Sequence, residues 1–196
     1  MTNFEKATRN TLFWRVPGQV AASQGRNKRF VEMLDFFPTA VDLMGLPKIA
    51  TCTGVDQPPT VQCLQGQSYA DEFVPPATGP ATGPATGEAA VRVSGGPKQH
   101  IFSQWPYPAA FSPGGPGYMR MGYTVRSDDG YRLTQYVPYS ETTYSGNWSD
   151  ATHDDDIELY DYNNDPDETT NQAANATYAD VVQKLGAVLK KQYTST

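Results

Sequence analysis

Few residues in this 196-residue chain have the type and spacing that enzyme chemistry requires. The two histidines, His100 and His153, are far apart in the sequence, which leaves little material for a zinc site or a histidine-based triad. Two acidic groups, Asp128-Asp129 and Asp154-Asp155-Asp156, are better explained as a hairpin turn and a solvated acidic loop than as metal sites. The sequence therefore assigns no catalytic residue and no metal ligand.

The two cysteines, Cys52 and Cys63, flank the turn-forming pair Pro58-Pro59. Such a turn could bring their Cα atoms within the roughly 4.4–6.8 Å that a disulfide needs. Two buried thiols without a bond fit the same spacing equally well. The spacing alone leaves both alternatives open.

Two sequons, beginning at Asn147 and Asn175, are candidates for glycosylation and fit a secretory route. The first residues, M-T-N-F-E-K, lack the basic and apolar regions of a signal peptide. We therefore expect further polypeptide before Met1.

The composition excludes several classes of partner. No run of about 18 apolar residues exists, so we expect no membrane-spanning helix and no membrane partner. The net charge is -6, from 15 basic and 21 acidic side chains, and the basic ones are scattered. Because nucleic-acid binding needs a concentrated positive patch, we expect no nucleic-acid partner.

The N-terminal part predicts one strand and one helix. The apolar run Thr11–Val16 ends at Pro17-Gly18 and predicts a buried strand. Asp35 is a good N-cap for a helix that continues to Met44 and ends at Gly45. Further along, the A-T-G-P repeats at 77–87 have nothing to bury, and we interpret them as a spacer or surface insertion.

The C-terminal half predicts a small antiparallel sheet packed by a helix, which is an α+β fold. Strand patterns occur at 99–105, 118–126, 131–137 and 157–162, with a hairpin turn at Asp128-Asp129-Gly130. A helix is expected over about 177–192, with a capping box of Thr177 and Asp180. Its apolar stripe comprises Val181, Val182, Leu185, Val188 and Leu189.

A series of short motifs also runs through the chain in a fixed order. They are N-F-E-K-A-T-R at 3–9, R-V-P-G at 15–18, V-E-M-L-D-F-F-P-T at 31–39, L-M-G-L at 43–46, L-Q-G-Q-S at 64–68, F-S-Q-W-P at 102–106, M-G-Y-T-V-R at 121–126, E-L-Y-D at 158–161 and D-P-D-E at 165–168. Together they resemble the C-terminal part of a type I sulfatase of the alkaline-phosphatase-like superfamily, most closely the iduronate-2-sulfatase branch. The resemblance covers nearly the whole chain except about 70–98.

The resemblance implies an organisation in three parts. Residues 1–50 would be the end of the large sulfatase α/β domain and would supply a strand and a helix of it. Residues 51–98 would hold the insertion and a small disulfide loop closed by Cys52 and Cys63. Residues 99–196 would form the C-terminal subdomain.

The resemblance also implies that the catalytic groups lie upstream of this sequence. Sulfatases use a cysteine in a C-x-P-S-R motif, oxidised to formylglycine, together with a calcium ion held by acidic residues. Neither Cys52 nor Cys63 has that context. Calcium and formylglycine are therefore expected only in a full-length enzyme.

By the same resemblance, Ser103, Gln104, Trp105 and Tyr107 are candidates for the rim of a substrate site. The aromatic rings would stack on a sugar and Gln104 would donate or accept a hydrogen bond. The family often has an arginine where this chain has Tyr107. The alternative is that these residues only pack the edge of the sheet.

The resemblance implies the C-terminal fragment of a sulfuric ester hydrolase that acts on sulfated sugars or glycosaminoglycans. The chain alone would lack the catalytic core. A secretory, lysosomal or extracellular location would follow. The alternative is a stand-alone, non-catalytic module that binds a glycan or a protein.

Overall fold

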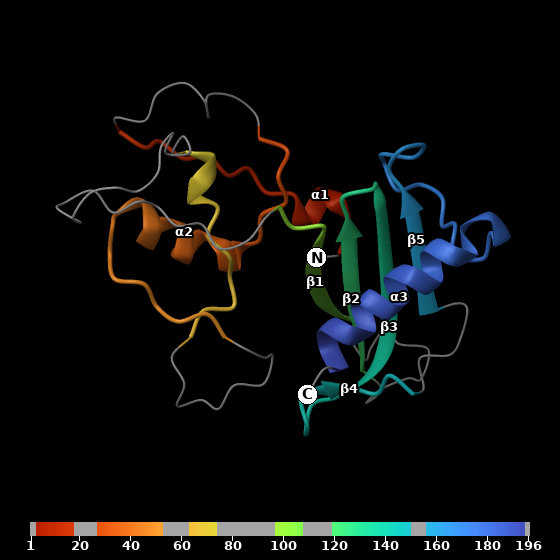
Figure 1. Cartoon of the computed structure of the whole chain (residues 1–196). Helices are drawn as coiled ribbons and strands as arrows, with labels where there is room; N and C mark the ends of the chain where they lie inside the picture. Colours follow the sequence, from red (N-terminus) through yellow and green to blue (C-terminus); the bar gives the residue numbers. More distant parts are fainter. Residues whose placement is uncertain are drawn as a thin grey trace. The chain divides into compact units, whose positions relative to one another are not determined.

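The computed structural model describes residues 3–17, 27–52, 63–73, 97–107, 119–149 and 156–194 (Figure 1). The chain divides into two compact units. The first unit comprises Met1–Thr11 with Gln99–Ser195, and the second comprises Leu12–Lys98. The A-T-G-P repeats at 77–87 lie outside the described residues.

An antiparallel sheet forms the centre of the first unit. β2 pairs with β1 on one side and β3 on the other, and β3 also pairs with β5 and β4. The strands are β1 (His100–Tyr107), β2 (Arg120–Ser127), β3 (Tyr131–Ser140), β4 (Ser145–Gly146) and β5 (Ile157–Asp161). The four predicted strands at 99–162 are confirmed.

The hairpin between β2 and β3 sets the register of the sheet. Its turn is Asp128-Asp129-Gly130, and Gly130 has a φ of 103°. Glycine adopts this backbone conformation readily because it has no Cβ. Thr124 lies opposite Thr134 in this register, and their buried hydroxyl oxygens are 2.8 Å apart. The turn predicted from the Asp-Gly pair is confirmed.

One face of the sheet carries the apolar core of the first unit. Helix α3 (Ala179–Thr194) crosses this face (Figure 1) and buries Leu185 and Leu189 against it. The other buried members of the core are Met121, Tyr123, Val125, Leu133, Val137 and Leu159. The predicted α+β fold, with an antiparallel sheet packed by a C-terminal helix, is confirmed.

The start of this helix differs from the prediction. A short 3-10 helix, Ala176–Tyr178, precedes α3, and the side chain of Asn175 caps it by accepting a hydrogen bond from the Thr177 amide at 3.1 Å. The predicted capping box of Thr177 and Asp180 is wrong, because the chain turns into the helix two residues earlier.

The opposite face of the sheet is polar and is covered by the short helix α1 (Glu5–Thr8). The Asn3 side chain donates a 2.9 Å hydrogen bond to the carbonyl of Gly122 on β2. The ring of Phe4 packs edge-on against Tyr160 on β5, with ring centroids 5.6 Å apart. Residues 3–8 therefore cover one face of a sheet whose first strand begins at residue 100.

Asp161, at the end of β5, has a carboxylate that several hydrogen bonds hold in place. Its buried carboxylate accepts hydrogen bonds from Asn164 Nδ2 (2.7 Å), the Asn163 amide (3.0 Å) and the Tyr178 hydroxyl (3.0 Å). Burial alone would raise the pKa of Asp161, but these bonds outweigh it and hold the pKa below its usual value.

We therefore expect the stability contributed by Asp161 to be fully present above about pH 4, the ordinary aspartate range, and to be lost as the pH falls through the lower folded pKa. The difference in free energy of unfolding between wild type and Asp161→Asn, measured by urea denaturation, should shrink over that range. Asp180→Asn, an exposed change on α3, is the control. An equal difference at pH 7 and at pH 3 would contradict the assignment.

The second unit contains α2 (Phe36–Leu43), which a short 3-10 helix, Met33–Asp35, precedes. Gly45 ends the helix with a φ of 65°. The predicted helix and its glycine terminus are confirmed. Asp35 is the N-cap residue of α2, as predicted, but its side chain makes no capping bond to the helix. Its carboxylate instead accepts bonds from the Glu32 amide (2.9 Å) and the Gln67 amide (2.7 Å) and pairs with Lys98.

The strand expected at Thr11–Val16 is also wrong. These residues form no strand, and the side chain of Phe13 is 86% exposed. A strand needs a hydrogen-bonded neighbour, and no strand in the described ranges pairs with this segment. Instead, Trp14 stacks on Phe36 with centroids 4.6 Å apart and donates a 2.8 Å hydrogen bond to the Tyr69 hydroxyl.

Cys52 and Cys63 form a disulfide, with Cα atoms 5.0 Å apart. The backbone supports the closure, because the Cys52 amide donates to the Leu64 carbonyl at 2.9 Å and the Leu64 amide donates to the Ala50 carbonyl at 2.8 Å. The disulfide is confirmed.

None of the described helices is both long and apolar enough to cross a bilayer.

Candidate functional site

The four candidate rim residues lie on β1 but do not share one face. Successive side chains of a strand point to opposite faces. Ser103, Trp105 and Tyr107 accordingly lie on the polar face with α1, whereas Gln104 lies on the α3 face with Phe102. Ser103 donates a 3.2 Å hydrogen bond to Asn3 Oδ1.

Three aromatic rings gather at one end of the polar face, and we call them the aromatic platform: Trp105, Tyr107 and Tyr136. Tyr107 and Tyr136 meet edge-on with centroids 5.9 Å apart. Gly122 lies between Trp105 and Tyr136 in the register, and a Cβ there would come within 2.9 Å of the Tyr136 ring. Glycine at this position therefore leaves the space that the Tyr136 ring occupies.

The platform remains accessible. Trp105 is 37% exposed and Tyr107 is 40% exposed, while Tyr136 is half-buried. Strand β1 is hydrogen-bonded to β2 alone among the strands of the described residues, so the two exposed rings stand at an edge of the sheet.

The charges next to the platform are held in contacts of their own. Arg120, opposite Tyr107 in the register, forms an ion pair with Asp156 and donates a 3.0 Å hydrogen bond to the Tyr136 carbonyl. Asp156 is 4% exposed, so its assignment to a solvated acidic loop is wrong: the arginine compensates its burial. Asp154 and Asp155 lie outside the described residues.

A carboxyl group also borders the platform. Glu158 is hydrogen-bonded to the Tyr136 hydroxyl. Burial raises the pKa of Glu158 above its usual value, although the bond from Tyr136 opposes the shift. Burial and the nearby Glu158 carboxyl also raise the pKa of Tyr136.

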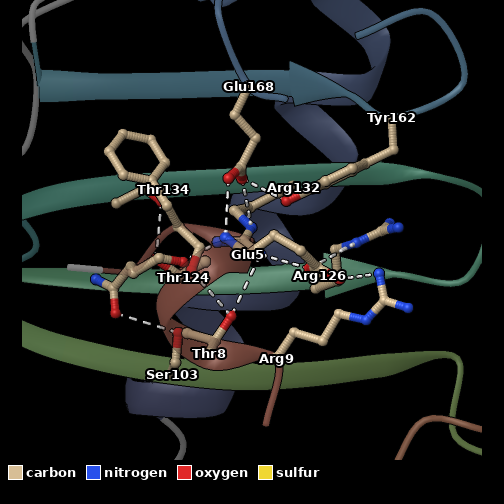
Figure 2. A network of polar contacts seen from close by, with 12 residues as sticks. Glu5, Thr8, Arg9, Ser103, Thr124, Arg126, Arg132, Thr134, Tyr162 and Glu168 are labelled. Carbon is tan, nitrogen blue, oxygen red and sulfur yellow. Dashed lines mark hydrogen bonds and ion pairs between the residues drawn. The ribbon is translucent and has the colours of Figure 1, made fainter. Parts of the chain in front are cut away.

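A network of buried charges occupies the middle of the same face (Figure 2). The guanidinium of Arg132, on β3, forms two ion pairs. One is with the Glu5 carboxylate of α1, at 2.9 Å between nitrogen and oxygen, and the other is with the Glu168 carboxylate of the loop after β5, at 3.2 Å. It also donates to the carbonyl of Asn3 and, at 3.4 Å, to the hydroxyl of Thr8. Arg132 thus binds α1 and the loop after β5 to the sheet.

Glu168 is fixed by several contacts. It accepts hydrogen bonds from the Glu5 amide at 2.8 Å and from the Tyr162 hydroxyl. Its φ of 55° lies in the left-handed region, which non-glycine residues rarely adopt. The ion pair with Arg132 offsets that backbone cost.

Arg126 and Tyr162 flank this network. The Arg126 guanidinium lies 3.9 Å from the centre of the Tyr162 ring, a cation–π contact. Burial lowers the pKa of Arg126, and burial together with the Glu168 carboxylate raises the pKa of Tyr162. Because Glu5 and Glu168 are both held by Arg132, neither is placed to act as a general base. The network positions the covering segments, and the platform is the part of this face available to a ligand.

Among the described residues, the acidic side chains of the polar face are not gathered as a cation site. No three His, Cys, Asp or Glu side chains gather as metal ligands in the part of the chain that the structure describes, so a calcium ion does not fit these residues. Asp129 lies at the hairpin turn and pairs with Lys184 at 3.3 Å. Its carboxylate also accepts a bond from Ser127. His153 lies outside the described residues.

Both sequons lie at the surface of the first unit. Asn147 is exposed after β4, and its Oδ1 accepts a 2.6 Å hydrogen bond from the Ser149 hydroxyl. Asn175 is exposed before α3 and donates a 2.9 Å bond to Gln172.

Comparison with known proteins gives the family context of this geometry. No family model matches the sequence. The chain is 26% identical over 195 residues to the iduronate 2-sulfatase of Mus musculus, a match that covers 84% of this chain. The resemblance to the C-terminal part of a sulfatase is confirmed. The chain spans about a third of that sulfatase, 33% of its length.

A solved structure also aligns with the chain. It is that of BT4656 in complex with its substrate D-glucosamine-2-N,6-O-disulfate, at 19% identity, covering 81% of this chain and 24% of that one. The TM-score is 0.41, at which the likeness supports no inference about this chain.

Sequence reasoning missed Tyr136, Glu158 and Arg120 as neighbours of the rim. A signal was present, because the Asp-Gly hairpin fixes the register and thereby places Tyr136 across Gly122 from Trp105. The pairing of Arg120 with Asp156 had no such signal, since Asp156 lies outside any regular strand pattern.

Proposed function

We propose that this chain is the C-terminal part of a sulfuric ester hydrolase that acts on sulfated sugars. The observation that carries the proposal is the match to the mouse sulfatase, which extends over 84% of this chain but only 33% of the relative. The ordered motifs support the same assignment. The polar face of the sheet would contribute contacts to the sugar.

The chemistry would reside in the remainder of such an enzyme. Both cysteines are bonded to each other, so neither is available for oxidation to formylglycine, and the sequence contains no C-x-P-S-R motif. Formylglycine would supply the nucleophile and calcium would stabilise sulfate charge. This chain's own residues would orient the sugar and exclude water around it.

The disulfide and the two exposed sequons support a secretory, lysosomal or extracellular location. In such a compartment the bond between Cys52 and Cys63 would persist.

The test is to isolate the native polypeptide with an antibody against the C-terminal helix and to measure its mass, its peptides and its sulfatase activity. We expect a mass well above 21.5 kDa, peptides containing an oxidised C-x-P-S-R cysteine, and release of sulfate from sulfated sugars. A native product of 21.5 kDa that releases no sulfate would refute the proposal.

The second candidate is a stand-alone module that binds a glycan without hydrolysing it. The accessible rings of Trp105 and Tyr107 favour it, because exposed aromatic rings can bind sugars without catalytic groups. A native 21.5 kDa product with measurable glycan affinity would establish this alternative in place of the hydrolase.

A further inference from the structure

We infer that the aromatic platform binds an uncharged sugar ring, so that the sugar unit it contacts is neither a uronic acid nor sulfated on the face that stacks. The inference rests on the proposed function, because it names the kind of sugar that the polar face would recognise.

The shape of the platform suits the flat face of a pyranose. Trp105 and Tyr107 are two residues apart on β1 and therefore point to the same side of the sheet. Tyr136 extends this surface across Gly122, and its ring meets Tyr107 edge-on. A sugar presents a ring of C–H groups, which packs well on such apolar aromatic surface.

The charged residues next to the platform disfavour the binding of an anion. Recognition of a carboxylate or sulfate normally uses an arginine whose fork of donors is available. Arg120 is the arginine that lies opposite Tyr107, and it is already paired with Asp156 and bonded to the Tyr136 carbonyl. An anionic substituent placed here would meet no compensating charge from Arg120.

The bordering carboxyl points to the same conclusion. Glu158 adjoins Tyr136 and would oppose a second carboxylate at this position. Together, the Tyr136 hydroxyl and the Glu158 carboxyl offer hydrogen bonds suited to sugar hydroxyls. A neutral ring would thus gain both stacking and hydrogen bonds.

The experiment uses NMR titration to compare the affinities of the whole chain for two disaccharides of similar size. One is uncharged, N,N′-diacetylchitobiose, and the other carries a glucuronic acid. We expect the uncharged disaccharide to bind about tenfold or more tightly than the glucuronate, and Trp105→Ala to weaken its binding by a similar factor. Circular dichroism of each variant checks that it is folded.

Two matched variants on β1 test the charge argument. Tyr107→Arg places a cation on the platform, and we expect it to raise glucuronate affinity about tenfold. Gln104→Arg adds the same charge on the opposite face of the strand and should leave that affinity unchanged. Tighter glucuronate binding by the wild type, or an equal gain from both variants, would overturn the inference.

Failure of this inference and failure of the proposed function give different results. If neither disaccharide binds the wild type, the platform is not a sugar site, whatever the native mass shows. If the native polypeptide releases no sulfate while the uncharged disaccharide still binds, the inference about the platform holds and the hydrolase assignment fails.

Discussion

Replacing Arg132 with methionine should lower the free energy of unfolding of the first unit by about 3–5 kcal/mol, the usual effect of removing one partner from a buried ion pair. Arg132 is 2% exposed, and its guanidinium faces the carboxylates of Glu5 and Glu168. Methionine fills much of the same volume but leaves Glu168, whose side chain is 4% exposed, without its cation. The loss is large because an unpaired buried charge is costly.

Hydrogen exchange of the β2 and β3 amides, measured on the whole chain, reports this loss within the first unit. The matched control is Lys184→Met, which breaks the exposed pair with Asp129 and should change stability by at most about 1 kcal/mol. Adding Glu5→Gln and Glu168→Gln to the Arg132→Met variant should recover part of the loss. If Arg132→Met proves as mild as Lys184→Met, the network is not a determinant of this fold.

Truncating Leu189 to alanine should destabilise the same unit by about 2–5 kcal/mol, through lost apolar contact and the cavity left behind. Leu189 is fully buried on α3 and belongs to the cluster that includes Leu133 and Leu159 on the sheet. The effect would show as a lower midpoint of urea unfolding with an unchanged slope.

The neighbouring change Lys190→Ala tests the orientation of α3. Lys190 follows Leu189 directly and is exposed, so its truncation should alter stability by no more than about 0.5 kcal/mol. Equal effects of the two truncations would mean that α3 does not pack on the sheet through its Leu185–Leu189 stripe.

The elements that could be predicted are those specified by local sequence. The hairpin follows from an Asp-Gly pair between two alternating runs, and α3 follows from apolar residues at helical spacing. The end of α2 follows from Gly45 in the same way, since a left-handed residue at that point stops the helix.

The elements that could not be predicted depend on distant partners. The apolar run at 11–16 has the composition of a strand, but pairing decides whether a strand forms. Asp35 has the type of an N-cap, yet Gln67 and Lys98 fix its carboxylate elsewhere. Arg132 meets Glu5 across 127 positions of sequence, and no local pattern encodes such a pair. The four rim candidates were predicted as one group, although alternation along a strand places Gln104 on the opposite face from Ser103, Trp105 and Tyr107.

The attachment of residues 3–8 to the sheet has a consequence for synthesis on the ribosome. This segment is translated well before its partners: Gly122 is 119 positions away from Asn3, and Glu168 is 163 away from Glu5. In the nascent chain this segment has none of these partners until the intervening residues have been translated. Because contacts so distant in sequence slow folding, the first unit should close only after translation of β5 and the loop that follows it, which leaves its β-strands exposed to chaperones until then.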